Sequence, residues 1–252
     1  MTSIAMRKVF AFPESLKPAE THYCPGCGHS IAHRLVAECL DEFGLRGRTI
    51  GVPGVGCAFL AYLYFNFDMV EAPHGRALAV ATGVKRVHPD KFVITYQGDG
   101  DLAAIGTGET IHAANRGEKL SVIFINNAIY GMTGGQMAPT TIIGQLSTTT
   151  PGGRDADRDG NPIDISRMLA VAAGAVYIER CALTTLKDIR KAKKAIAKSF
   201  RCQLDGLGFS MVELLSPCPT NWKLSPHDAW KWVNEQMQKV FPLGVIKDTT
   251  GY

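Results

Sequence analysis

The sequence predicts an α/β protein built on a doubly wound, mostly parallel sheet. Short Val- and Ile-rich runs alternate with segments of helical periodicity, a pattern typical of parallel strands joined by crossover helices. Two of these runs end in polar, glycine-rich turns, as strands do where an open α/β sheet binds a ligand at its carboxyl edge. With 252 residues, of which 46% are hydrophobic, the chain can bury a large core.

The first half of the chain contains the helix and strand signals in regular order. A helix is predicted over residues 30–43, with Ser30 as its N-cap and Gly44 as its stop. The run "RTIGVPGVGCA" begins as a strand and breaks into glycines, and "HGRALAVATGVKRVHPD" predicts a helix that Pro89 ends. The pattern then repeats twice: the strand "KFVITYQ" leads through "GDGD" into "LAAIGTGETIHAANRG", and the strand "LSVIFINN" leads into "AIYGMTGGQ".

The second half continues the alternation after one irregular region. Residues 133–165 are too long for an ordinary connector and form a candidate functional or interface loop. A helix is expected around "ISRMLAVAAGA", then the strand "AVYIER", the helix "TTLKDIRKAKKAIAKSF" and the strand "GFSMVELLSPCPT". We expect an N-terminal arm over residues 1–21, the main domain over residues 22–220 and a helical, tryptophan-containing extension over residues 221–252.

The composition excludes several classes of function. The net charge of +4 is modest and the basic residues are scattered except in "RKAKKAIAKSF", so no nucleic-acid partner is expected. No run approaches the roughly 20 apolar residues that span a bilayer, and the first 20 residues lack a signal peptide pattern, so we expect a cytoplasmic protein without a membrane anchor. Seven cysteines are too few for a disulfide scaffold and leave metal or redox chemistry open.

Polar and glycine residues at two neighbouring strand exits predict a phosphate and magnesium site. Gly98 and Gly100 of "QGDGD" allow a close backbone approach to a ligand, and a helix N-terminus at Asp101 suits a diphosphate. Mg²⁺ prefers oxygen ligands, which Asp99, the Asn127 amide and the carbonyl of Ile129 would supply. Either motif alone is commonly a turn or a helix cap, so the prediction depends on the two motifs occurring together.

The two motifs together also resemble a motif of a known protein family. Asn127, the second Asn of "NN", follows Asp99 of "GDG" by 28 positions, as in the thiamine diphosphate motif. From about His22 to Thr220 the chain resembles the thiamine-diphosphate-binding β subunit of 2-oxoacid:ferredoxin oxidoreductases, on the stretches "YCPGCGH", "GVGC", "HGRA", "GDGDL", "NNAIYGMTGGQ" and "PCPTNW". The resemblance implies the thiamine-diphosphate-binding fold. It also implies the decarboxylation of a 2-oxoacid to its acyl-CoA, with electrons passing through an iron-sulfur cluster to ferredoxin.

The resemblance assigns roles motif by motif. Asp99, Asn127 and the Ile129 carbonyl match magnesium ligands, and His74 of "HGR" matches a catalytic histidine near the cofactor. The diphosphate cradle and the loop beside the thiazolium ring match these residues: Gly98, Gly100, Asp101, Gly131 and Met132, and Val55, Gly56, Cys57 and Ala58. Arg76 could serve the site or pair with a carboxylate of a neighbouring subunit.

The cysteines allow several interpretations from spacing alone. The C-x-x-C of "HYCPGCGH" could hold a metal, exchange disulfides or carry electrons. The resemblance implies that Cys24, Cys27, Cys57 and Cys218 bind one [4Fe-4S] cluster, and Pro25 and Pro219 follow ligand cysteines as in ferredoxin-type runs. Structural zinc is the alternative for this set; a thioredoxin-type dithiol is disfavoured because no strand precedes it. We expect packing roles for the remaining cysteines, which are Cys39, Cys181 and Cys202.

Two weaker motifs could also bind metal. "DADRDG" imitates an EF-hand loop but has Ser166 where a bidentate Glu is required, so a solvated loop is favoured. His29 and His33 lie one helical turn apart, and packing or hydrogen bonding is favoured over metal binding for them.

Partners and substrate follow from the resemblance. The glutamate that activates the aminopyrimidine is expected from the pyrimidine-binding domain of an α subunit, and γ and ferredoxin-like δ subunits are expected beside CoA, a 2-oxoacid and ferredoxin. Leu60 stands where some relatives carry a basic residue, which favours a branched-chain acid such as 2-oxoisovalerate. 2-Oxoglutarate, pyruvate and aryl 2-oxoacids stay open, as do two other functions: a non-redox decarboxylase or synthase, and a non-catalytic electron-transfer subunit.

Overall fold

The computed structural model describes residues 11–252, so the first ten residues of the expected arm 1–21 lie outside the described part. A single sheet of seven strands, in the order β2-β1-β3-β4-β6-β5-β7, forms the centre of the molecule. Its strands are β1 (Thr49–Pro53), β2 (Asp68–Met69), β3 (Phe92–Gly98), β4 (Ser121–Asn126), β5 (Ala175–Ala182), β6 (Phe209–Leu215) and β7 (Gly244–Asp248). Every neighbouring pair is parallel except β5 and β7. The doubly wound, mostly parallel sheet is therefore confirmed.

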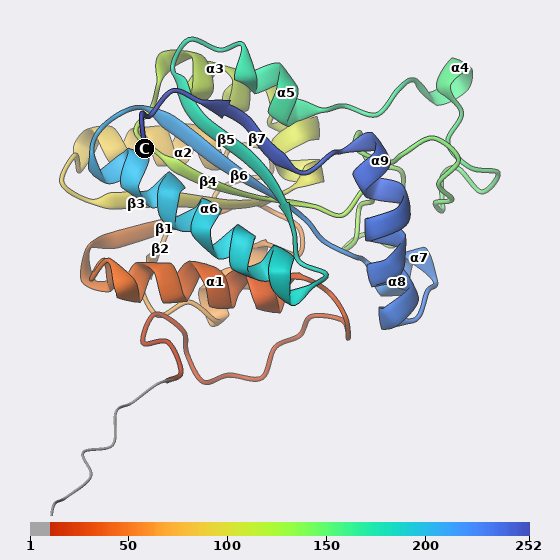
Figure 1. Cartoon of the computed structure of the whole chain (residues 1–252), viewed down its shortest axis with the longest axis horizontal. Helices are drawn as coiled ribbons and strands as arrows, with labels where there is room; N and C mark the ends of the chain where they lie inside the picture. The colour runs from red at the N-terminus through yellow and green to blue at the C-terminus, as the bar shows by residue number, and fades with distance from the viewer. Residues whose placement is uncertain (1–10) are drawn as a thin grey trace, which may run out of the picture.

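Helices cover both faces of the sheet (Figure 1). One face carries α1 (His29–Glu42) and α6 (Leu186–Leu204), which pack against each other. The other carries α2 (Ala77–Val87), α3 (Thr107–Arg116) and α5 (Ile165–Ala170). Each layer encloses its own buried apolar cluster, which is why the central strands are apolar along their whole length rather than alternating.

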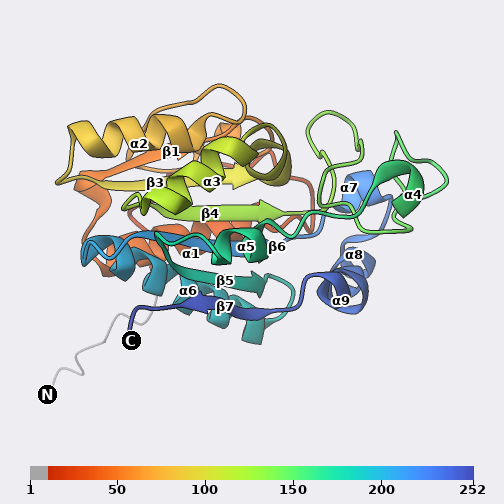
Figure 2. The same cartoon turned by 90° about the horizontal axis from the view of Figure 1, so that it is seen from above.

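The remaining helical segments are short and lie mostly beyond the sheet. They are η1 (Arg46–Arg48), η2 (Phe59–Leu63), η3 (Gly100–Ile105), α4 (Ala156–Asp159), α7 (Pro219–Trp222), α8 (Pro226–Trp232), η4 (Val233–Met237) and α9 (Gln238–Val240). Figure 2 shows the parallel strands pointing toward the end of the molecule where α4, α7, α8 and α9 gather. None of the helices in residues 11–252 combines the length and apolar character needed to cross a membrane.

Several local predictions were wrong at the ends of elements. Helix α1 begins at His29 with Gly28 as its N-cap, so Ser30 lies inside the helix and does not cap it. The helix expected after "GDGD" is divided into the π-helical turn η3, with Asp99 as its N-cap, and α3. No helix follows β4 directly in the described chain; the next residues form turns.

The sequence analysis also missed the two edge strands. β2 is only two residues long, and β7 lies in the C-terminal region 221–252, which we expected to be helical throughout. β7 runs antiparallel to β5 and closes that edge of the sheet. The C-terminal region is therefore partly a strand of the main sheet.

Candidate active site

A cavity opens at the carboxyl ends of β1, β3 and β4. It is lined by the residues that the sequence analysis assigned to the cofactor and magnesium: Val55, Gly56, Cys57, Ala58, His74, Gly98, Asp99, Gly100, Asp101, Asn127, Ile129, Gly131 and Met132. It is also lined by residues that the sequence analysis did not assign to it: His29, Ile105, Ile125, Tyr130 and Thr133. Parallel strands bring these segments together because their carboxyl ends share one edge of the sheet.

Asp99 lies buried at the base of this cavity. Its Oδ1 atom accepts a hydrogen bond from the Gly100 amide at 2.9 Å, and its Oδ2 atom accepts one from the Thr140 hydroxyl at 2.8 Å. Burial raises the pKa of Asp99 to about 6, although these hydrogen bonds oppose the shift. A buried carboxylate of this kind is costly without a nearby cation, which makes Asp99 a suitable metal ligand.

Three oxygen-bearing groups converge beside Asp99. One atom of the Asn127 side-chain amide lies 2.7 Å from the Ile129 carbonyl oxygen and 3.2 Å from Asp99 Oδ2. With its nitrogen in that position the amide donates to both oxygens, and with its oxygen there the three groups present a set of hard donors to one point. A carboxylate, an amide oxygen and a carbonyl are ligands that Mg²⁺ accepts, so these residues fit the ion.

Gly100 is part of the cavity wall, at a position where a larger residue would not fit. A Cβ atom at Gly100 would lie 2.9 Å from Cε1 of Tyr130, so only glycine lets the Tyr130 ring pack against the start of η3. Gly100 and Tyr130 therefore line the cavity together, and a diphosphate cradle there would use the backbone N–H groups at the start of η3.

Asp101 fixes the part of the cavity wall that contains His74. Its buried carboxylate accepts hydrogen bonds from His74 Nδ1 at 2.8 Å, the Gly75 amide at 2.7 Å and Gln97 Nε2 at 2.6 Å. Because three donors already occupy the side chain, Asp101 could serve a diphosphate only through its backbone N–H. With Nδ1 bound to Asp101, Nε2 is the nitrogen that His74 can offer to a ligand in the cavity.

Arg76 lies next to this region but does not line the cavity. Its guanidinium pairs with Glu109 of the same chain, and the Arg76 side chain is about half exposed. The sequence allowed Arg76 either a role in the site or a pairing with a carboxylate of a neighbouring subunit. In the structure its partner is Glu109 on α3 of its own chain.

The four cysteines of the predicted cluster come from three loops that meet beside the cavity. A Cβ atom at Gly131 would lie 3.4 Å from Cys57 Sγ and 3.5 Å from Cys218 Sγ, so both thiols lie near Gly131, and Cys57 itself lines the cavity. Burial, with a smaller contribution from other cysteines of the set, raises the pKa of Cys27 to about 12 and that of Cys57 to about 11. Cys24, by contrast, is exposed.

A thiol with a raised pKa tends to keep its proton, whereas the metal ligand is the thiolate. Such a thiol therefore binds metal only when a cationic centre stabilises the thiolate form. All seven cysteines are free, and within residues 11–252 no three or more His, Cys, Asp or Glu side chains are grouped closely enough to share one metal ion. The donor set is the one that an iron-sulfur cluster requires, namely four thiolates. Cys39, Cys181 and Cys202 are buried in the core, which confirms their packing roles.

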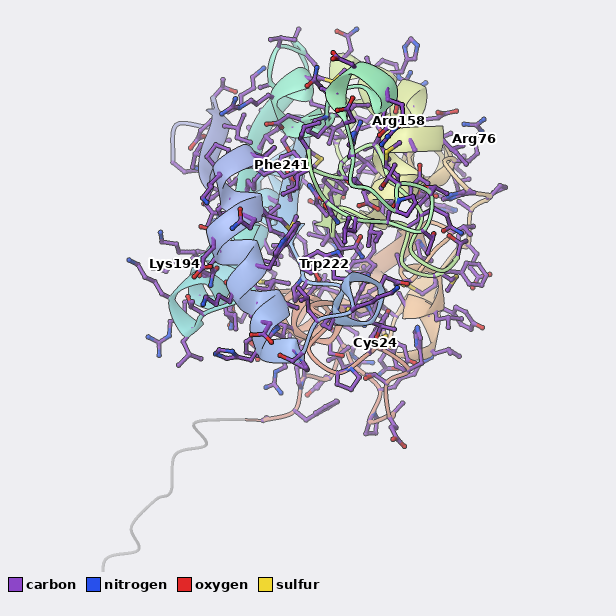
Figure 3. The ribbon with its side chains drawn as sticks, turned by 90° about the vertical axis from the view of Figure 1, so that its right-hand side faces the viewer. Cys24, Arg76, Arg158, Lys194, Trp222 and Phe241 are labelled. Atoms are coloured by element: carbon purple, nitrogen blue, oxygen red, sulfur yellow. The ribbon has the colours of Figure 1, made fainter. Side chains whose placement is uncertain are left out.

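The cysteine loop is fixed by the C-terminal helices. Trp230 Nε1 donates to the Gly26 carbonyl at 2.8 Å, and a Cβ atom at Gly26 would lie 2.6 Å from Cβ of Pro226. Figure 3 looks onto this end of the molecule, with Cys24 beside α7 and with α8 and α9 along one side. The C-terminal helices therefore dock on their own chain and contact the loop that carries Cys24 and Cys27.

His29 and His33 lie beneath the cysteine loop in an aromatic cluster. His29 Nδ1 bonds the Tyr96 hydroxyl at 2.8 Å, and His33 Nε2 lies 3.3 Å from the Tyr23 hydroxyl. Burial lowers the pKa of His29 to about 3, so the ring is neutral at physiological pH. The expectation of packing and hydrogen bonding is confirmed, and His29 lines the cavity as well.

Comparisons with known proteins agree with this arrangement. Residues 54–212 match the family model described as thiamine pyrophosphate enzyme, C-terminal TPP binding domain. The chain is 48% identical over 244 residues to the ketoisovalerate oxidoreductase subunit VorA of Methanothermobacter marburgensis, covering 97% of this chain and 51% of that protein. It is 39% identical over 220 residues to the 2-oxoglutarate synthase subunit KorB of Methanocaldococcus jannaschii, covering 84% of this chain and 77% of that protein.

A solved structure has the same fold. It is the 2-oxoglutarate:ferredoxin oxidoreductase from Magnetococcus marinus with 2-oxoglutarate, coenzyme A and succinyl-CoA bound, with a TM-score of 0.76 and 25% identity, covering 97% of this chain and 87% of that chain. The chain spans only about half the length of the VorA relatives that it matches. The chain belongs to the family of thiamine-pyrophosphate-binding subunits of 2-oxoacid:ferredoxin oxidoreductases.

Proposed function

We propose that this chain is the catalytic, thiamine-diphosphate-binding β subunit of a CoA-acylating 2-oxoacid:ferredoxin oxidoreductase. In this reaction the bond between the keto carbon and the carboxylate breaks, CO₂ leaves, the acyl group joins the CoA sulfur, and two electrons reduce ferredoxin. The observation that carries the proposal is the position of Gly131, which lines the cavity and whose Cα faces the thiols of both Cys57 and Cys218. The carbon chemistry and the electron acceptor would thus both lie next to Gly131.

The residues of the cavity would bind and orient the cofactor, which supplies the electron sink for decarboxylation when bound. Asp99, Asn127 and the Ile129 carbonyl would hold Mg²⁺ against its diphosphate. His74, held by Asp101, would present Nε2 to the reacting groups and hold or release a proton there. This binding site is proposed for the predicted domain of residues 22–220, whose sheet β7 of the C-terminal region completes.

Electrons would leave through a [4Fe-4S] cluster on Cys24, Cys27, Cys57 and Cys218. Cys57 and Cys218 lie on the cavity side, whereas Cys24 is exposed. This order runs from the site of carbon chemistry to the surface, where ferredoxin or a ferredoxin-like δ subunit would accept the electrons.

The activating glutamate would come from outside the described chain. Asp99 and Asp101 are the only carboxylates among the described residues that line the cavity, and both are held by internal hydrogen bonds. An α subunit that carries a pyrimidine-binding domain would close the cavity and supply that carboxylate, and a γ subunit would complete the assembly.

A branched-chain 2-oxoacid is the favoured substrate. The support is the 48% identity to a ketoisovalerate oxidoreductase subunit, together with the uncharged Leu60 in η2. 2-Oxoglutarate is the second candidate because the chain is 39% identical to a 2-oxoglutarate synthase subunit. An apolar pocket discriminates by about 1–3 kcal/mol per methylene, so a preference among acids would be a matter of degree.

The test is to purify the complex without oxygen and to assay a panel of 2-oxoacids with CoA and a viologen acceptor. We expect CoA-dependent viologen reduction that is fastest with 2-oxoisovalerate. Reduction by none of the acids would overturn the assignment. Thiamine diphosphate without cluster iron and acid-labile sulfide would indicate a non-redox decarboxylase or synthase, and a cluster without releasable cofactor would indicate an electron-transfer subunit.

A further inference from the structure

Ala128 adopts a left-handed backbone conformation between two of the groups assigned to magnesium. Its φ angle is +53°, which residues with a side chain rarely adopt. Asn127 precedes it and Ile129 follows it, so the conformation of Ala128 sets the position of the Asn127 amide relative to the Ile129 carbonyl. Such strained conformations persist only where surrounding contacts impose them.

The N–H of Ala128 is held from within the sheet. It donates to Asn126 Oδ1 at 3.1 Å, and Asn126 Nδ2 donates in turn to Glu213 Oε1 at 2.8 Å. Glu213 Oε2 accepts a hydrogen bond from Arg180 Nε at 2.7 Å. Asn126, Glu213 and Arg180 are each 1% exposed, so this side of the turn is anchored to the adjacent strands β6 and β5.

The carbonyl of Ala128 is held by the long irregular segment. It accepts hydrogen bonds from the Thr141 hydroxyl at 2.7 Å and from Gln145 Nε2 at 2.9 Å. The neighbouring Thr140 donates to Oδ2 of Asp99 at 2.8 Å, and Thr140 and Thr141 are both fully buried. Two consecutive threonines therefore hold the turn that carries Asn127 and Ile129 and also hold the carboxylate of Asp99.

A buried arginine fixes the threonines in turn. Arg154 Nη1 donates to the carbonyls of Pro139 at 2.9 Å and of Thr141 at 2.6 Å. Its Nε and Nη2 donate to the carbonyls of Gly160 and Asn161, at 2.9 and 2.8 Å. One guanidinium thus ties the segment around Thr140 to the far end of the irregular region.

We propose that residues 138–161 form a clamp that fixes the three magnesium ligands relative to one another, with Thr140 and Thr141 as positioning residues for the ion. The inference rests on the proposed function, because it requires Mg²⁺ at Asp99, Asn127 and Ile129. The irregular segment then has a defined structural role, since it holds Asp99 and the Ala128 turn at the spacing that the metal needs.

The test uses the whole complex, purified without oxygen, and compares wild type with Thr140→Val, Thr141→Val, Thr140→Ser and Thr141→Ser. Thr148→Val, an exposed position of the same segment, is the matched control. The readouts are the apparent Kd for Mg²⁺ at saturating thiamine diphosphate, from titration calorimetry, and the unfolding midpoint of the cofactor-free complex. We expect each valine variant to weaken Mg²⁺ binding about 10–100-fold and each serine variant, which keeps the hydroxyl, to restore it.

The outcomes of the experiment distinguish a failure of the clamp from a failure of the proposed function. Unchanged Mg²⁺ affinity in both valine variants, or no recovery with serine, would overturn the clamp while leaving the proposed function intact. A wild-type complex that binds no Mg²⁺ with the cofactor would overturn both. If Thr141→Val does not assemble, Gln145→Leu removes the other donor to Ala128 and is expected to weaken Mg²⁺ binding in the same range; wild-type affinity in that variant would count against the clamp.

Discussion

The Nδ1 atom of His74 lies 2.8 Å from Oδ1 of Asp101, whose carboxylate is completely buried. Asp101 also accepts the Gly75 amide, so one carboxylate orients both the ring of His74 and the backbone beside it. A carboxylate that fixes a histidine in this way selects the tautomer with its proton on Nδ1 and leaves Nε2 for chemistry.

Replacing His74 by glutamine should lower kcat for CoA-dependent viologen reduction about 100-fold, the smaller end of the range for a positioned acid or base. Asp101→Asn should lower kcat less and should alter the pH dependence of the rate, because the amide no longer selects one tautomer. Steady-state rates between pH 6 and 9 provide the measurement. His112→Gln, at an exposed position of α3, is the control, and equal losses in all three variants would refute a specific role for His74.

Gly54→Ala should destabilise the chain by about 1–3 kcal/mol, the cost of overpacking a filled site. A Cβ atom there would lie 2.0 Å from Oδ2 of Asp101, which is held on all sides and cannot move away. Urea unfolding at neutral pH measures the change. The matched control is Gly83→Ala in α2, where a Cβ atom meets nothing within 4 Å; it should raise stability by about 0.5–1 kcal/mol. Equal effects of the two substitutions would show that Asp101 tolerates displacement.

Cys24→Ser should remove the cluster while the chain stays folded. Cys24 is exposed, so the substitution leaves the core intact and acts through the loss of one thiolate ligand. Iron content, acid-labile sulfide and the visible absorption of the anaerobic protein should fall together. Cys202→Ala, in the core at the end of α6, should keep its iron; a Cys24→Ser protein with full iron would refute the assigned ligand.

Alkaline pH should destabilise the chain through Cys39. Burial raises the pKa of this thiol from 9.0 to about 12, so the unfolded chain releases the proton at lower pH than the folded one. The stability that Cys39 contributes is complete below pH 9 and is lost as the pH rises toward 12. Between pH 8 and pH 10 the loss is roughly 1 kcal/mol, since each pKa unit corresponds to about 1 kcal/mol. Urea unfolding at both values, compared with Cys39→Ala, isolates the effect, and a parallel response of the two proteins would exclude it.

The sequence predicted the sheet and much of the site because both depend on local patterns. β3, β4 and β6 are continuous apolar runs buried on both faces, and the residues that follow them carry distinctive motifs such as "GDGD" and "NN". The position of each motif at a strand exit was enough to predict that Asp99 and Asn127 would meet.

The remaining features depend on contacts between distant parts of the chain. Thr140, Thr141 and Arg154 lie in a segment without periodicity, and their partners, Asp99 and Ala128, are distant in sequence or carry no signal of their own. β2 and β7 are short edge strands whose existence depends on pairing with β1 and β5 rather than on their own residues. For His29 the sequence indicated packing or hydrogen bonding, and only the three-dimensional structure places it in the cavity wall.

Gly131 lies beside groups that belong to both halves of the proposed chemistry. A methyl group at this position would lie 3.6 Å from the Asn127 amide nitrogen and within 3.5 Å of the Cys57 and Cys218 sulfurs. These are ordinary van der Waals distances, so the position has room for a methyl group and little more. A larger side chain at position 131 would therefore press on a proposed magnesium ligand and on two proposed cluster ligands at the same time.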